Sequence, residues 1–246
     1  MNYFKYQLQN SPVVKNLLFI NILIFLAEVL LGDKGLDITD FGAVYYPDSS
    51  KFMPFQVITS PFLHGSFSHL FYNMFALFMF GCIIEQVMDS KKFLIYYIGC
   101  ALGATLFTWG VDAIMIQTLD LMPGAVEEIK IHGADILQQG YNFSDPNLAR
   151  LNIIYNVGTI GASGAIFGIL LAFGMIFPNR PIYLYFVMPI KAKWIVIIYG
   201  GFELLSGITQ NMYDNVAHFA HVGGMIVGII ILLYWKKNGT INFYKY

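Results

Sequence analysis

Six long apolar segments alternate with polar stretches along the chain, and this pattern is typical of a protein that crosses a membrane several times. The segments cover about residues 13–31, 70–87, 93–116, 160–177, 194–208 and 216–235. A helix needs roughly 17–25 apolar residues to span the hydrocarbon core of a bilayer. The fifth segment reaches this length only with residues 188–193, which would put Pro189 in its first turn, where proline is tolerated. The pattern predicts an all-α polytopic membrane protein with six transmembrane helices.

Two connections, 32–68 and 117–158, are too polar to span, and we place both outside the bilayer core. The second is long and acidic, and loops of this length are usually functional or flexible. Within it, the stretch 125–139 is compatible with a short surface helix. We therefore expect a single membrane domain over residues 1–246. Its core covers about 13–235, and it carries an inserted polar outer loop at about 117–158.

Composition excludes several classes of protein. The chain is 57% hydrophobic and only 12% charged, whereas soluble domains carry roughly 25% charged residues. A net charge of −1 without any basic cluster argues against nucleic-acid binding. Cys82 and Cys100 both fall in apolar segments, so we expect core thiols, without a disulfide or a metal site. The first apolar run is not followed by a cleavage pattern, so we do not expect a cleavable signal peptide.

The basic residues predict the orientation in the membrane. With six spans, the termini and the loops at 88–92 and 178–193 share one side. That side holds ten basic residues: Lys5, Lys15, Lys91, Lys92, Arg180, Lys191, Lys193, Lys236, Lys237 and Lys245. The other side holds four: Lys34, Lys51, Lys130 and Arg150. The positive-inside rule therefore places both termini in the cytoplasm, and we expect a multi-pass protein of the bacterial inner membrane.

Four polar side chains fall near the outer ends of three predicted spans. Ser163 begins the fourth span from outside, and His221 lies one to two turns into the sixth. His69 and Asn73 begin the second span and, at spacing i, i+4, share one helix face. Polar groups at such positions are costly in lipid and usually serve a function. The topology predicts that these four residues lie at similar depth, in a site that opens to the outer side.

Together these residue types suggest a serine hydrolase. A serine hydroxyl needs a base within hydrogen-bonding distance, and histidine is the usual base. The first turn of a helix favours a developing anion, so the Ser163 backbone N–H can help to hold an oxyanion, with His69 and Asn73 as further donors. No acid is obviously placed to orient His221, because Asp214 is seven residues away on a loop. We therefore expect a Ser163–His221 dyad and not a triad.

Small residues surround both catalytic candidates. Gly224 and Gly228 lie on the face of His221, at i+3 and i+7, and Gly164 begins a neighbouring stripe on the fourth helix. Small residues allow membrane helices to approach closely. Phe167, at i+4 from Ser163, is placed to pack beneath the imidazole. We expect these positions to support the dyad by bringing the fourth and sixth helices together.

These motifs resemble those of the rhomboid intramembrane proteases. The sequence GASGAIFG from Gly161 resembles the family's GxSG motif, AHVGG from Ala220 followed by Gly228 resembles its AHxxGxxxG helix, and HGSFSHLFYN, ending at Asn73, resembles its HxxxN segment. The chain departs from the family pattern at Phe55-Gln56, where a Trp-Arg pair is common, and at Asp89, where a glycine is expected.

The resemblance implies a serine endopeptidase that cuts membrane proteins in or near a transmembrane segment, without a cofactor. It implies Ser163 as nucleophile, His221 as base, and His69, Asn73 and the Ser163 N–H as oxyanion hole. It also implies that the fifth helix and the loop at about 206–215 gate and cap the site. The partners are then transmembrane substrates and the bilayer, with no nucleic acid, and the oligomeric state stays open.

Two other classes of function remain. A small transporter would use Glu28, Glu203 and the histidines as a relay, but it would predict inverted repeats, and none is visible. A catalytically inactive membrane-binding relative would be expected to lack Ser163 or His221. A metal site at the His/Asn cluster lacks a carboxylate or thiolate ligand. His218, one turn before His221, is a weaker candidate base, and Glu28 and Glu203 have no assigned role.

Overall fold

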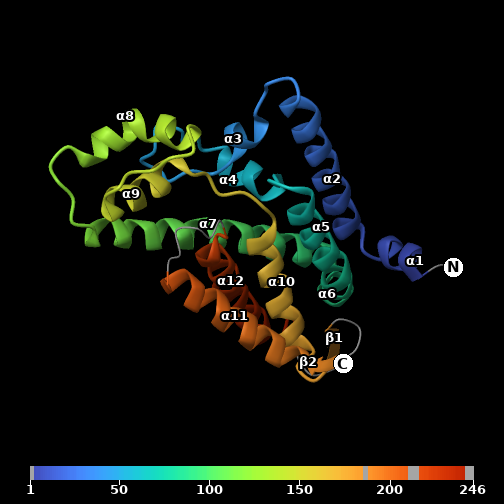
Figure 1. Ribbon diagram of the computed structural model, residues 1–246. Coiled ribbons are helices and arrows are strands. Elements are labelled where there is room, and N and C mark those ends of the chain that lie inside the picture. Colours follow the sequence, from blue (N-terminus) through green and yellow to red (C-terminus); the bar gives the residue numbers. More distant parts are fainter. Residues whose placement is uncertain (1–2, 185–187, 210–215, 242–246) are drawn as a thin grey trace.

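The computed structural model describes residues 3–184, 188–209 and 216–241, and in them the chain is an all-α polytopic membrane protein, as predicted (Figure 1). The α-helices are α1 (Tyr3–Gln9), α2 (Pro12–Gly32), α3 (Ile38–Gly42), α4 (Gln56–Thr59), α5 (Phe67–Ala76), α6 (Cys82–Met88), α7 (Ser90–Thr118), α8 (Ala125–Gln138), α9 (Pro146–Asn156), α10 (Ser163–Ile176), α11 (Ala192–Thr209) and α12 (His218–Lys237). A 3₁₀-helix η1 (Ser60–Phe62), a π-helical turn η2 (Leu77–Gly81) and the strands β1 (Pro181–Leu184) and β2 (Met188–Lys191) complete these elements.

Five helical stretches among the described residues are long and apolar enough to cross a membrane. They are α2, the continuous stretch Phe67–Met88, α7, α11 and α12. The predicted fourth span, 160–177, is a helix only over the 14 residues of α10, which corresponds to roughly 21 Å at 1.5 Å per residue. A hydrocarbon core is about 30 Å thick. Length and composition therefore support five spans, and the predicted count of six is not established.

The short helix α10 occupies the middle of the bundle (Figure 1). It packs against α7, α11 and α12 on one side and against α5, η2 and α6 on the other. Most of its side chains are buried. Because neighbouring helices pack around α10, Ser163 at its N-terminus is half-buried between them.

Glycines bring α10 and α12 into backbone contact. A Cβ atom at Gly224 would lie 1.9 Å from the carbonyl oxygen of Gly164, and one at Gly164 would lie 2.5 Å from the Cβ of Ala104 on α7. At Gly228, an added Cβ would lie 2.5 Å from the hydroxyl of Tyr96. Any side chain at these positions would push the helices apart. This close approach sets the distance between the residues that α10 and α12 carry.

The connection 117–158 is largely helical. The predicted surface helix at 125–139 is confirmed as α8, whereas α9 was not predicted. The two helices pack together beside one end of α7 (Figure 1). Asn152 Nδ2 donates to the Gly133 carbonyl and Asn156 Nδ2 to the Ile129 carbonyl, each at 3.2 Å. The inserted segment thus forms a small helical layer with its own buried contacts.

The possible extension of the fifth span to residue 188 is wrong. Residues Met188–Lys191 form β2, which pairs antiparallel with β1 in the register Pro181↔Lys191. Pro189 therefore lies in a strand, opposite Tyr183, and not in the first turn of a helix. The helix α11 begins at Ala192.

Two buried acids hold the N-terminal half together. Glu85 accepts hydrogen bonds from the backbone N–H groups of Val13 and Val14, at 2.9 and 2.8 Å, and so caps the start of α2. Glu28, which had no assigned role, accepts from Thr39 Oγ1 at 2.8 Å and from the His64 N–H at 3.2 Å. Both carboxylates therefore satisfy backbone groups near helix ends.

Candidate active site

Ser163 is the first residue of α10, and the residues before it hold it there. Gly161 has φ +112°, a conformation that favours glycine. Its N–H donates to the Ser60 carbonyl at 2.9 Å, and Thr159 pairs with Val44 in a short β-bridge. The chain therefore enters α10 from an anchored, extended segment. This explains why the helix starts at Ser163 and not at Ile160.

Ser163 and His221 lie in direct contact. The Oγ atom of Ser163 is 2.8 Å from Nε2 of His221, which projects from the first turn of α12. The ring of Phe167 stacks on the imidazole with centroids 4.1 Å apart and planes 9° apart. His221 is only 7% exposed. The structure thus brings together a hydroxyl and an imidazole in the geometry that an activated serine requires.

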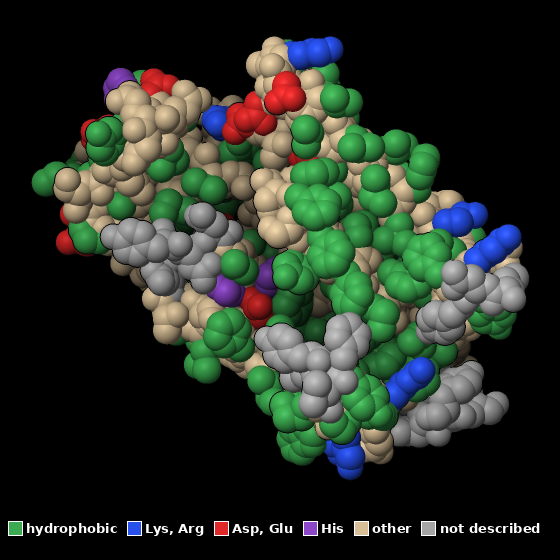
Figure 2. Space-filling view, turned by 45° about the vertical axis from the view of Figure 1, so that its right-hand side comes forward, with side chains coloured by type: hydrophobic (Ala, Val, Ile, Leu, Met, Phe, Trp, Pro, Cys, Tyr) green, Lys and Arg blue, Asp and Glu red, His purple; other side chains and the backbone are tan. Residues whose placement is uncertain are grey.

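An acid lies behind His221, where the sequence suggested none. The Oε2 atom of Glu203, on α11, is 2.8 Å from Nδ1 of His221 and 2.6 Å from Nδ1 of His218. Figure 2 shows histidine and acidic side chains side by side at a hollow that hydrophobic side chains border. The structure thus places an acid beside His221, where the sequence showed none within reach. Asp214, the acid considered from the sequence, lies outside the described residues.

The same three side chains also meet a geometric condition for a metal site. Their candidate ligand atoms all lie within 4.8 Å of one another, and all three residues are buried. A carboxylate and two imidazoles are ligands that zinc accepts. The same short distances are also expected for the hydrogen bonds from the two histidines to Glu203, so they do not by themselves indicate a metal. In the sequence, only the cluster of His69 and Asn73 suggests metal ligands.

His69 and Asn73 lie beside the segment that leads into Ser163. A Cβ added at Gly161 would lie 2.7 Å from Nε2 of His69 and 3.8 Å from Nδ2 of Asn73. Within the described part of the chain, the buried Nδ2 atom of Asn73 has no hydrogen-bond partner. A buried amide without a partner is unusual and calls for an explanation. An oxyanion that forms next to Ser163 is one group that Asn73 is placed to receive.

His64 lies behind His69 and is also buried, with ring centroids 5.0 Å apart. Burial, together with repulsion from His69, lowers the pKa of His64 to about 4. His64 is therefore neutral at neutral pH. It adds bulk beneath His69 but no positive charge to the site.

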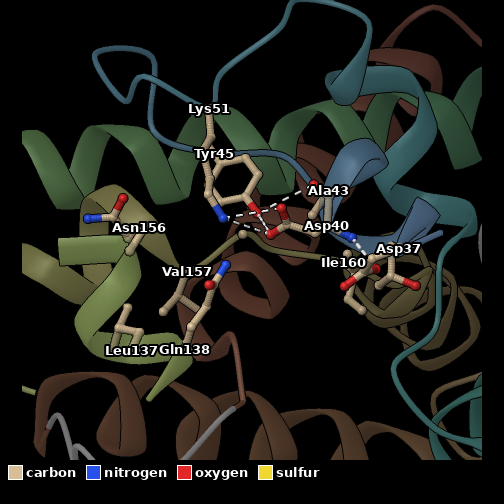
Figure 3. Close-up of a pocket in the computed structure, with 13 residues that line it drawn as sticks. Asp37, Asp40, Ala43, Tyr45, Lys51, Leu137, Gln138, Asn156, Val157 and Ile160 are labelled. Atoms are coloured by element: carbon tan, nitrogen blue, oxygen red, sulfur yellow. Dashed lines mark hydrogen bonds and ion pairs between the residues drawn. The ribbon is translucent and has the colours of Figure 1, made fainter. Parts of the chain in front are cut away.

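A pocket of about 500 Å³ opens elsewhere, between residues 37–51, the end of α8 and the segment 156–160 (Figure 3). Lys51 Nζ lies 2.9 Å from Asp40 Oδ1, and the Tyr45 hydroxyl bonds to the same carboxylate. Burial raises the pKa of Asp40, but the bonds from Tyr45 and Lys51 outweigh it, and the pKa lies below its usual value. Neither Ser163 nor His221 lines this pocket.

One sequence signal could have identified Glu203 as a site residue. An acid within an apolar span is rare and indicates a functional site by default. Its histidine partners cannot be recognised from the sequence, because 15 and 18 residues separate them from Glu203. Only the packing of α11 on α12 brings them together. The cap expected at about 206–215 lies largely outside the described residues.

Comparison with known proteins gives a consistent picture. The family model of the rhomboid domain matches residues 51–238. The mitochondrial Rhomboid protein 1 of Saccharomyces cerevisiae is 27% identical over 183 residues, which cover 74% of this chain and 42% of that protein. The mitochondrial RHOMBOID-like protein 12 of Arabidopsis thaliana is 29% identical over 174 residues, or 71% of this chain and 44% of that protein. Rhomboid protease AarA of Providencia stuartii is 25% identical over 242 residues, or 92% of this chain and 73% of that protein. The chain thus spans less than half the length of the two mitochondrial relatives.

Proposed function

Because the chain belongs to the rhomboid family, whose members are known as intramembrane proteases, we propose that it is a serine endopeptidase. Its substrates are membrane proteins, which it cleaves in or near their transmembrane segments. One observation carries this proposal: the 2.8 Å contact between Ser163 Oγ and His221 Nε2 at the half-buried N-terminus of α10. A hydroxyl paired with an imidazole in this way is a common arrangement for acyl transfer.

In the proposed reaction, His221 Nε2 takes the proton of Ser163 as Oγ attacks the carbonyl carbon of the scissile bond. The tetrahedral intermediate carries its negative charge on the former carbonyl oxygen. The Ser163 backbone N–H, Asn73 Nδ2 and the His69 ring donate to this oxygen. His221 then gives the proton to the leaving amine, and water hydrolyses the acyl-enzyme by the same steps.

The supporting residues hold this geometry. Gly161 permits the sharp entry into α10, and Gly164 lies against the backbone of α12 at Gly224. Phe167 supports one face of the imidazole, and Gly228 lets Tyr96 of α7 approach α12. No step in this scheme needs a cofactor or a metal. The whole chain acts as a single membrane domain, with the segment 117–158 as an outer insertion.

We also infer the orientation in the membrane from the distribution of basic residues. With the short helix α10 counted as a sixth span, both termini share one side, and ten of the fourteen Lys and Arg residues fall on that side. The positive-inside rule assigns it to the cytoplasm. The site then opens to the outer side. A bacterial inner membrane stays a prediction, since the similar proteins include mitochondrial and bacterial members.

A transporter is the less supported function. A proton relay would need Glu28 to face the histidines or Glu203 across the bundle. Glu28 instead bonds to Thr39 and to the backbone of His64, in a structural contact. The pair Ser163–His221 has no role in such a relay.

The test is cleavage of a panel of tagged single-span substrates by the detergent-solubilised protein. We expect defined products from the wild type and none from Ser163→Ala, which removes one hydroxyl and should leave the melting temperature nearly unchanged. A fluorophosphonate probe should label the wild type and not the variant. Substantial cleavage by Ser163→Ala would refute the assignment of the nucleophile.

A further inference from the structure

Glu203 is an acidic residue in an apolar helix, and its carboxylate is buried. Glu203 is only 6% exposed, and it lies two turns before the end of α11. A buried charge is costly unless polar partners surround it. Its Oε2 atom contacts Nδ1 of His218 and Nδ1 of His221, at 2.6 and 2.8 Å. The position of this carboxylate is therefore tied to the imidazole next to Ser163.

The contact with His221 determines where the ring carries its proton. An ionised carboxylate only accepts hydrogen bonds, so Nδ1 of His221 must be the donor. In the neutral ring, Nε2 then carries a lone pair. That lone pair faces Ser163 Oγ at 2.8 Å. With Glu203 in place, His221 is in the tautomer that can accept the serine proton.

We propose that Glu203 is a positioning residue for His221, so that the site works as a Glu203–His221–Ser163 triad and not as a dyad. The inference rests on the proposed function and deepens it. When Nε2 takes the proton from Ser163, the Nδ1 proton stays on the ring, and the imidazolium charge is paired with the carboxylate. Glu203 remains ionised throughout, and the proton goes to the leaving amine.

Two contacts in different directions then fix the ring. Phe167 stacks on one face of His221 at 4.1 Å, which limits tilting. An imidazole N–H points outward in the ring plane, so the 2.8 Å contact between Nδ1 and Glu203 limits rotation about the Cβ–Cγ bond. Both restraints keep Nε2 directed at Ser163.

His218 is the second donor to the same oxygen. The two imidazoles are nearly perpendicular, at 86°, with centroids 6.4 Å apart, so they approach Oε2 from different directions. A carboxylate oxygen has two lone pairs and can accept from both. The role of His218 is to hold the carboxylate in place and to offset part of its desolvation.

A purely structural role for Glu203 makes different predictions. If Glu203 only ties α11 to α12, its loss should lower the melting temperature and leave chemistry unchanged in the folded fraction. If it positions His221, its loss should lower kcat and the rate of labelling by a fluorophosphonate, with KM nearly constant. Measuring kcat and KM per folded protein therefore distinguishes the positioning role from the structural role.

The experiment compares Glu203→Gln, Glu203→Asp and the matched control Glu85→Gln in detergent or proteoliposomes. Glu85 is also a buried acid in a predicted span, but it bonds to the start of α2, away from the site. The amide of Glu203→Gln can turn its NH₂ toward Nδ1 and stabilise the wrong tautomer. We expect a loss of kcat on the order of 10²–10⁴-fold, with slower probe labelling. Glu203→Asp, which keeps the charge, should recover part of the loss, and Glu85→Gln should keep the wild-type kcat.

Wild-type kcat in folded Glu203→Gln, with Ser163→Ala inactive, would overturn this inference and leave the proposed function intact. Cleavage by Ser163→Ala would instead refute the proposed function itself. If Glu203→Gln does not fold, a kcat for Glu203→Asp equal to that of Glu203→Ala in the folded fraction would also overturn the inference.

A stoichiometric divalent metal that purified wild type retains and Glu203→Gln loses would also overturn it and would assign the cluster of Glu203, His218 and His221 to metal binding. A metal on Nδ1 would leave Nε2 protonated and unable to accept the serine proton.

Discussion

His221 has a different partner on each side of its ring, and this makes it the most sensitive residue of the site. Nε2 faces Ser163 and Nδ1 faces Glu203, both at 2.8 Å. His218 contacts the same carboxylate oxygen through its own Nδ1, at 2.6 Å. The two histidines therefore should differ sharply in function, although they are one helical turn apart and equally buried.

His221→Ala should abolish both cleavage and fluorophosphonate labelling, because an unactivated serine is inert at neutral pH. His218→Ala should retain measurable activity, because it removes a second donor to Glu203 and leaves the bond to His221. The measurement is kcat and probe labelling for both variants, normalised to folded protein. The opposite order of effects would mean that the base has been assigned to the wrong histidine.

Asn73 offers a test of the oxyanion hole. Its buried Nδ2 atom has no partner within the described part of the chain, so its benefit should appear mainly in the transition state. Asn73→Ala should lower kcat by roughly 10²–10³-fold with KM nearly unchanged. Turnover and melting temperature should be measured on one preparation. Full turnover with a lower melting temperature would show that Asn73 only bridges helices.

Among the elements, the pair α10–α12 decides the geometry of the site. The backbones of these helices touch where Gly164 meets Gly224, and Gly168 lies close to the backbone of Gly224 and to Cys100 of α7. The serine is at one end of this contact and the histidine is on the facing turn. An increase of about 1 Å in the interhelical distance would take Oγ and Nε2, now 2.8 Å apart, beyond hydrogen-bonding range.

Gly224→Val should therefore reduce both activity and stability. An added Cβ would lie 1.9 Å from the Gly164 carbonyl oxygen, and overpacking of this kind typically costs about 1–3 kcal/mol. Gly110→Ala on α7 is the control, since an added Cβ there meets nothing within 4 Å. Unchanged turnover and melting temperature in Gly224→Val would contradict the helix contact described above.

The molecule as a whole places apolar side chains outside and polar chemistry inside. Large hydrophobic residues of the long helices are exposed, among them Phe19, Leu106, Ile198 and Phe202, and Figure 2 shows a broad hydrophobic surface. Ser163, His221 and Glu203 lie within the bundle, where neighbouring helices shield them. This arrangement suits a bilayer, because lipid covers the apolar surface while the bundle supplies the polar partners.

The proposed orientation can be tested with two single cysteines. His132 on α8 and Asn238 after α12 are both exposed, whereas the native thiols of Cys82 and Cys100 are 1% and 0% exposed. In intact bacterial cells, a membrane-impermeant maleimide should label His132→Cys and not Asn238→Cys. Both should be labelled after permeabilisation. Labelling of Asn238→Cys alone in intact cells would reverse the proposed topology.

The sequence by itself determined the class of the protein and which two helices, those of Ser163 and His221, pack closely. Apolar segments of bilayer length specify membrane helices because lipid cannot satisfy a free backbone. Small residues around Ser163 and His221 indicated the close packing of two helices. These features depend on local composition and period, so they can be recognised without knowledge of the fold.

The tertiary structure alone decided three other features. The length of α10 follows from the anchored turn at Gly161, which depends on contacts with Ser60 and His69 from distant parts of the chain. The helix α9 has a weak apolar pattern and is held by its packing on α8. The third member of the proposed triad, Glu203, meets His221 only because α11 is rotated so that this face meets α12. The rotation of a helix about its axis is set by packing against neighbouring helices. It therefore cannot be predicted from the order of residues within that helix.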